Sequence, residues 1–239
     1  MKNIFLEGMI LMFTIATAVA ALAEAASNIS PDEALKMLTE GNNRFVTGQA
    51  HHPDQSAARR HQTAEQGQKP FAVVLACSDS RVPVEEIFDR GIGDIFVVRD
   101  AGNIATKTDI GSIEYAVDHL GSPLVMVMGH SGCGAVTETV QGGEAPPNIK
   151  AIMDDIAPAL AKVKAANPGL TGEALIAEVI KANVWQAMED IFKNSPMMRE
   201  KVKDGKVKLV GALYDIDSGK VSWLGPHPQQ GQLSAGEAK

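Results

Sequence analysis

Cysteine, aromatic residues and runs of basic residues are all scarce in this chain of 239 residues. It has two cysteines, so one disulfide bond is the most that they can form with each other. Aromatic residues make up 5% of the chain and hydrophobic residues 45%, which is typical of ordinary soluble globular proteins. The formal net charge of -7 and the lack of a Lys/Arg-rich run argue against nucleic acid or an anionic membrane surface as a partner.

Long hydrophobic runs are also lacking. The longest, from Gly8 to Ala23, is shorter than the roughly 20 residues that a transmembrane helix needs. Lys2 precedes it, and Ala23-Glu24-Ala25 fits a signal-peptidase cleavage site. We therefore expect 1–25 to be a secretory signal peptide, with an uncleaved anchor as the alternative. Residues 26–239 are expected to form a single exported domain. In a bacterium this domain would be periplasmic and free of the membrane after cleavage.

Several short apolar runs without alternation predict strands that are buried on both faces, as in a parallel sheet. Helical patterns lie between these runs, and the repeated order of strand and helix predicts an α/β fold with right-handed crossovers. The expected sheet is central, mainly parallel and flanked by helices. The runs are 71–76, 95–98 and 124–128, and the first helix is expected to begin after the N-cap Ser30.

The C-terminal third predicts long helices followed by a hairpin. Amphipathic segments at 149–166 and 171–194 carry no chemistry that the sequence assigns. The runs 208–214 and 221–224 flank an Asp-Ser-Gly turn and predict a C-terminal β-hairpin. The tail after Pro226 is expected to be loose, with no role for its histidine.

Both cysteines lie in short polar segments that follow predicted strands. One segment is Cys77-Ser-Asp79-Ser-Arg81 and the other is His130-Ser-Gly-Cys133. Because ligands bind at the carboxyl ends of strands in open α/β sheets, the two segments are expected to converge. Cys77, Asp79, His130 and Cys133 form a set suited to one tetrahedral zinc ion. A disulfide between the cysteines, which an oxidising compartment favours, is the alternative.

The two segments resemble the C-x-D-x-R and H-x-x-C motifs of the β-class carbonic anhydrases. The resemblance extends from the Ser30 helix to the region of Trp223. It implies a β-carbonic anhydrase-like fold, Zn²⁺ as cofactor held by Cys77, His130 and Cys133, and a homodimer or homotetramer. It also implies reversible hydration of carbon dioxide to bicarbonate and a proton, by attack of zinc-bound hydroxide.

The resemblance gives Asp79 two possible positions. Paired with Arg81, its carboxylate stays ionised and orients the nucleophile, so that both residues are predicted to be catalytic. Released from Arg81, it occupies the fourth coordination position and closes the site. An exported zinc-binding protein with such a closed site, and a hydrolase of COS or CS2, are the alternative functions. The backbone at Gly102 and Gly132 is expected to leave room for carbon dioxide.

Some members of that family are inhibited through a noncatalytic bicarbonate pocket built from tryptophan, arginine and tyrosine. The matching positions in this chain are Val74, Arg99 and Tyr214. Valine lacks the aromatic wall that tryptophan supplies, so the sequence argues against this form of inhibition.

Overall fold

The computed structural model describes residues 29–236. The predicted signal peptide at 1–25 therefore lies outside the described residues. Within 29–236, none of the helices combines the length and the apolar character that crossing a bilayer requires.

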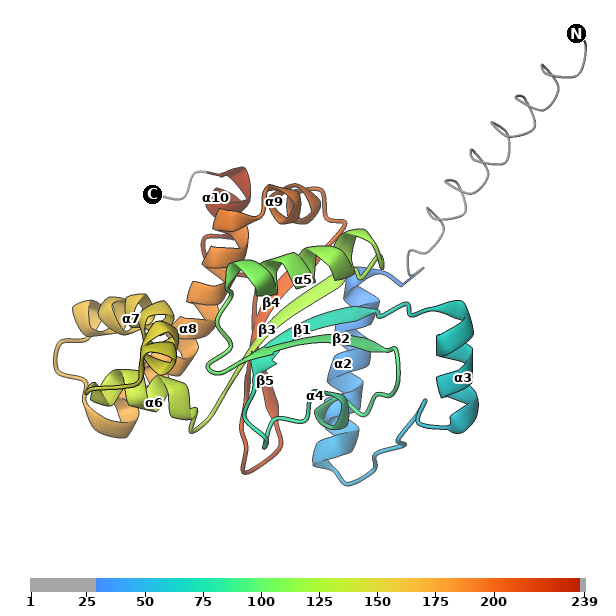
Figure 1. Cartoon of the computed structure of the whole chain (residues 1–239), viewed down its shortest axis with the longest axis horizontal. Helices are drawn as coiled ribbons and strands as arrows, with labels where there is room; N and C mark the ends of the chain where they lie inside the picture. The colour runs from blue at the N-terminus through green and yellow to red at the C-terminus, as the bar shows by residue number, and fades with distance from the viewer. Residues whose placement is uncertain (1–28, 237–239) are drawn as a thin grey trace, which may run out of the picture.

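A five-stranded sheet forms the centre of the molecule (Figure 1). Its strands lie in the order β2-β1-β3-β4-β5, in which the first four are parallel and β5 is antiparallel to β4. The mainly parallel sheet and the C-terminal hairpin that the sequence predicts are confirmed. The strands are β1 Ala72–Cys77, β2 Ile95–Asp100, β3 Leu124–His130, β4 Lys208–Tyr214 and β5 Val221–Gly225.

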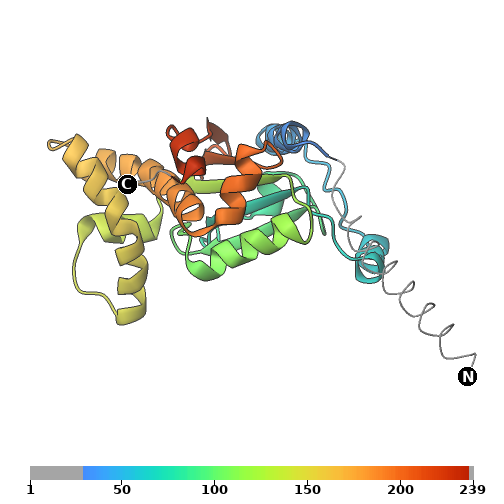
Figure 2. The ribbon, with the colours of Figure 1, turned by 90° about the horizontal axis from the view of Figure 1, so that it is seen from above.

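Helices cover both faces of the sheet because its central strands are apolar on both sides. Val73 and Leu75 of β1 face one cluster of buried residues, and Val74 and Ala76 face another on the opposite side. Figure 2 shows α5 and α2 on these opposite sides. The first cluster involves α5 Lys107–Asp118, α8 Gly172–Asn194 and α9 Pro196–Lys203, and the second α2 Pro31–Val46 and α4 Val84–Ile87.

A third group of helices lies beyond the carboxyl ends of the strands (Figure 1). It comprises α6 Gly134–Gln141, α7 Pro147–Ala166 and the first half of α8. The apolar residues of these helices enclose both Cys77 and Cys133 in one buried cluster. The third group therefore forms the wall of whatever site the two cysteines create.

The polar connection before β1 contains one helix, α3 Ala57–Gln66. The tail after Pro226 was expected to be loose, and this prediction is wrong. It forms α10 Gln230–Ala235, and Leu233 packs into the cluster shared by α8 and α9. His227 is buried, with its Nε2 3.4 Å from Glu189 Oε1 and its ring edge-on to Trp185.

The contact between α2 and α4 depends on a glycine in the middle of α2. A Cβ atom at Gly41 would lie 1.8 Å from the carbonyl oxygen of Phe88. Gly111 provides a contrast, since it lies on the exposed side of α5 and a Cβ there would meet none of the described atoms within 4 Å.

We expect Gly41→Ala to lower the free energy of unfolding by about 1–3 kcal/mol, because backbone must move to admit the methyl group. The matched variant Gly111→Ala should raise the free energy by roughly 0.5–1 kcal/mol, because alanine loses less backbone entropy in a helix. Urea unfolding of both variants measures the difference, and equal effects would contradict the close contact at Gly41.

Candidate metal centre

Two neighbouring parallel strands bring the predicted ligands together. Cys77 is the last residue of β1 and His130 the last residue of β3, and these strands pair directly. Cys133 follows three residues later as the N-cap of α6. The convergence arises because the carboxyl ends of parallel strands meet at one edge of a sheet.

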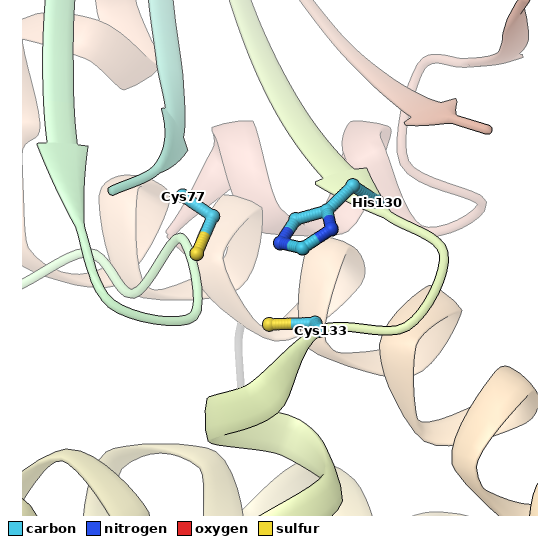
Figure 3. A group of neighbouring side chains, drawn as sticks. All are labelled: Cys77, His130 and Cys133. Carbon is cyan, nitrogen blue, oxygen red and sulfur yellow. The ribbon is translucent and has the colours of Figure 1, made fainter. Parts of the chain in front are cut away.

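The three side chains point toward one another (Figure 3). One ligand atom from each of Cys77, His130 and Cys133 lies within 4.8 Å of the other two. His130 is fully buried, Cys133 is 1% exposed and Cys77 is 4% exposed. Both cysteines are free, so the alternative disulfide does not form between these two described residues.

The imidazole of His130 is oriented by a backbone carbonyl. Its Nδ1 lies 3.0 Å from Ser131 O, and since a carbonyl only accepts, this nitrogen carries the proton. The other nitrogen, Nε2, is buried and has no hydrogen-bond partner within the described part of the chain. Its lone pair is therefore available to a metal, an arrangement common for metal-binding histidines.

The two sulfur atoms share one negative charge easily and two with difficulty. A hydrogen bond with the Cys133 side chain is the largest influence on Cys77 and lowers its pKa to about 4, against the effect of burial. Backbone N–H groups of Gly102 and Asp79 also donate to Cys77 Sγ, at 3.2 Å and 3.4 Å. The pKa of Cys133 is raised, first by its hydrogen bond with Cys77 and then by burial.

A divalent cation would allow both cysteines to be thiolates, because it compensates the second negative charge in a buried place. Two sulfurs and an imidazole nitrogen with a free lone pair are ligands that zinc prefers. The residues that the structure brings together therefore fit the zinc ion that the sequence predicts.

Arg81 holds the carboxylate of Asp79 beside this cluster. Its Nε donates to Oδ1 at 3.0 Å and its Nη2 to Oδ2 at 2.7 Å, a bidentate pair. These hydrogen bonds hold the pKa of Asp79 well below its usual range. Asp79 Oδ2 lies 4.0 Å from His130 Nε2. The structure thus has Asp79 in the paired arrangement, and its binding to a metal stays a prediction.

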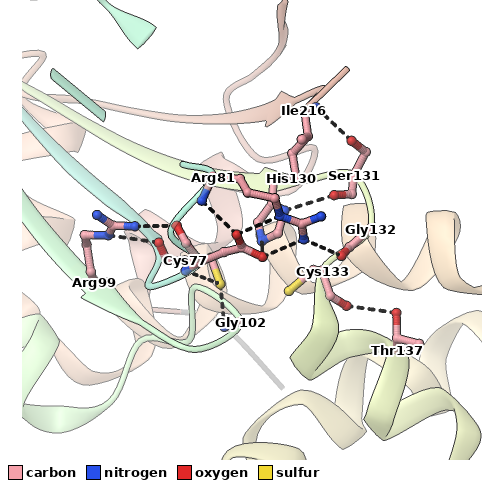
Figure 4. A network of polar contacts seen from close by, with 11 residues as sticks. Cys77, Arg81, Arg99, Gly102, His130, Ser131, Gly132, Cys133, Thr137 and Ile216 are labelled. Atoms are coloured by element: carbon pink, nitrogen blue, oxygen red, sulfur yellow. Dashed lines mark hydrogen bonds and ion pairs between the residues drawn. The ribbon is translucent and has the colours of Figure 1, made fainter. Parts of the chain in front are cut away.

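Hydrogen bonds to backbone groups fix the two ligand segments (Figure 4). Arg81 Nη2 also donates to Gly132 O at 3.3 Å, which joins the first segment to the second. Ser131 is held on both sides, as its N–H donates to Tyr214 O and its Oγ accepts from the N–H of Ile216. At the start of α6, Thr137 Oγ1 donates to Cys133 O at 2.9 Å.

Arg99 supports the first segment from the neighbouring strand. Its Nε donates to Cys77 O at 3.0 Å and its Nη2 to Asp79 O at 2.7 Å. Val74 is fully buried within β1, and Tyr214 is buried at the end of β4. Two of the donors on the Arg99 guanidinium thus hold backbone carbonyls of the segment that carries Cys77 and Asp79.

The sequence did not predict one contact to the site, which runs through Gly102. Gly102, expected only to leave room, donates its N–H to Cys77 Sγ, and its carbonyl accepts from Asn183 Nδ2 at 2.6 Å. Asn183 lies in α8, to which the sequence assigned no chemistry. The available signal was a polar residue three positions after Ile180 and four before Ala187, on the apolar side of the helix.

Comparisons with known proteins agree with this geometry. The carbonic anhydrase family profile matches residues 72–221. Carbonic anhydrase 2 of Mycobacterium tuberculosis is 38% identical over 197 residues, which cover 81% of this chain and 92% of the relative. The carbonic anhydrase of Mycolicibacterium smegmatis is 37% identical and covers 81% of this chain and 93% of its own.

A solved structure gives the same answer for the fold. A β-carbonic anhydrase of the ascomycete Sordaria macrospora, described as tetrameric, superposes with a TM-score of 0.64 at 27% identity, covering 78% of this chain and 94% of that one. The chain therefore belongs to the carbonic anhydrase enzyme family, in its β class. The resemblance inferred from the two motifs is confirmed.

A carboxyl group beside the site carries an electrostatic penalty. Asp100 ends β2 and pairs in register with Cys77. Burial raises its pKa to about 6, helped by a hydrogen bond with Asp109 and by repulsion from Asp109 and Asp155. An acid with a raised pKa in the folded state destabilises the fold at every pH above its ordinary value, because ionisation is easier in the unfolded chain.

We expect Asp100→Asn to stabilise the protein at pH 8 by about 1–2 kcal/mol, allowing for solvent screening. The gain should shrink as the pH falls from about 6 to below 3.8, because Asp100 then becomes protonated in the folded and in the unfolded chain. Thermal unfolding across this range measures it. Asp118→Asn is the control of opposite sign, because a hydrogen bond from Lys201 lowers the pKa of Asp118. A gain that does not depend on pH would contradict the assignment.

Proposed function

We propose that this protein catalyses the reversible hydration of carbon dioxide to bicarbonate and a proton, with Zn²⁺ held by Cys77, His130 and Cys133. The observation that supports the proposal is the buried convergence of two sulfurs and an unpaired imidazole nitrogen, in a chain of this family. When bound, zinc supplies the Lewis acidity that lowers the pKa of water toward about 7 and makes it a nucleophile.

In this proposal Asp79 and Arg81 orient the reacting groups. Arg81 keeps the Asp79 carboxylate ionised, so that it can only accept hydrogen bonds. The carboxylate lies 4.0 Å from the His130 Nε2 atom, where it can accept a hydrogen bond from a proton-bearing group and fix the direction of that group. The hydrogen bond from Arg81 to Gly132 O holds the Asp79–Arg81 pair against the segment that carries His130 and Cys133.

The paired Asp79 favours an enzyme over a closed zinc-binding protein. Both of its carboxylate oxygens accept hydrogen bonds from Arg81, so closing the site would require the bidentate pair to break. Hydrolysis of COS or CS2 would use the same metal and the same carboxylate, and substrate assays separate it from carbon dioxide hydration.

We also propose assembly as at least a dimer and export to the periplasm. The first is supported by the relative from Sordaria macrospora, which is described as tetrameric. The second is supported by the residues of 1–25 alone.

The purified protein should contain about one zinc per chain and hydrate carbon dioxide in a stopped-flow assay at pH 7 or pH 9. Cys133→Ala should lose the zinc and the activity, because one sulfur ligand is removed. The control Ser80→Ala alters an exposed residue near the site and should keep both. Zinc without hydration at either pH would indicate the closed binding protein, and hydrolysis of COS or CS2 in its place would indicate the third candidate.

Arg81→Ala should retain zinc and reduce turnover of carbon dioxide by about 10- to 100-fold, because Asp79 loses its bidentate partner. Arg81→Lys keeps the charge without the paired geometry and should fall between the wild type and Arg81→Ala. Zinc content by elemental analysis and stopped-flow rates check both statements. A normal rate in Arg81→Ala would remove Arg81 from the proposed mechanism.

A further inference from the structure

Asn183 is a polar residue on the buried side of a long helix. It is 1% exposed and lies in α8 among apolar neighbours that face the sheet and the third group of helices. A buried amide is costly unless it is hydrogen-bonded. Its Nδ2 donates to the carbonyl of Gly102 at 2.6 Å, a contact that joins positions 81 residues apart. The apolar neighbours of Asn183 within α8 are Val179, Ile180, Val184 and Ala187.

Gly102 is held tightly on all sides. Its φ of +87° is strained for any other residue, and a Cβ atom there would lie 2.8 Å from Ile156 Cδ1 and 3.2 Å from Ala135 Cβ. Its N–H donates to Cys77 Sγ at 3.2 Å (Figure 4). The two backbone groups of one residue thus connect a metal ligand of β1 with an amide of α8.

The two donors to Cys77 Sγ differ in how they are positioned. The N–H of Asp79 belongs to the same short segment as Cys77 and follows it along the chain. The N–H of Gly102 comes from the connection between β2 and α5 and needs an anchor elsewhere in the fold. Asn183 supplies that anchor by holding the carbonyl of the same residue.

Hydrogen bonds to a metal-binding side chain usually tune metal affinity, because they orient the ligand and change its donor strength. Resting on the zinc site proposed above, we propose that Asn183 is a positioning residue for Cys77. It acts through Gly102, whose N–H it keeps directed at the sulfur. A residue whose only role is to make a hydrogen bond in the core would affect stability and leave the metal affinity unchanged.

The test is Asn183→Leu, which keeps the branching at Cγ and has no donor. Two properties are measured on the full chain: zinc affinity by competition with a chelator, and the thiolate-to-cobalt charge-transfer band after cobalt(II) substitution. The zinc Kd should rise by about 10- to 100-fold. The band should move to lower energy, because the sulfur lone pair is no longer stabilised by the N–H of Gly102.

Ile191→Ala is the matched control, since Ile191 is fully buried two turns further along α8 and belongs to a core cluster that includes none of the three proposed ligands. It should lower the melting temperature without changing the zinc Kd or the cobalt band. A Kd within twofold of wild type and an unshifted band in Asn183→Leu would overturn the proposal.

If Asn183→Leu does not fold, Asn183→Asp decides by the same two measurements. It keeps the shape and places an acceptor against the carbonyl of Gly102. Wild-type protein that binds neither zinc nor cobalt would overturn the proposed function as well. Wild-type protein that binds both, with unchanged Asn183 variants, would overturn only the role of Asn183.

Discussion

The pairing of β1 with β3 is the constraint on which the rest of the site depends. It brings the ends of two strands side by side and so places Cys77 next to His130, although 52 residues of chain lie between them. The buried apolar faces of both strands hold their register, because a slip by one residue would turn each side chain to the opposite face. The hydrophobic core therefore sets the geometry of the candidate metal centre.

Around this pairing, hydrogen bonds between side chains and backbone carbonyls hold the segments of the site in place. Carbonyls of Cys77 and Asp79 are held by Arg99, and the carbonyl of Gly132 is held by Arg81. Side chains of the site are thus attached to segments that are themselves tied to strands and helices. Such support suits chemistry that depends on a fixed acceptor and a fixed ligand direction.

The sequence predicts the parts of the fold that follow local rules. Continuous apolar runs identify the buried strands, and the positions of Cys77 and His130 directly after them predict their convergence. The role of Asn183 could not be predicted, because its partner Gly102 is remote along the chain and only the fold joins them. The tail was misjudged because Pro226 and Pro228 suggest a loop, whereas His227 and Leu233 dock on α8. The paired state of Asp79 is likewise a property of the assembled site.

The order of the strands has a consequence for how the protein matures. A growing polypeptide that has reached Cys133 already contains all three proposed ligands, yet β4 and α8 are still to be synthesised. Without β4 the outer side of β3 is unpaired, and without α8 the wall behind Gly102 is missing. The cluster of Cys77, His130 and Cys133 can therefore reach its final arrangement only after β4 and α8 have been synthesised.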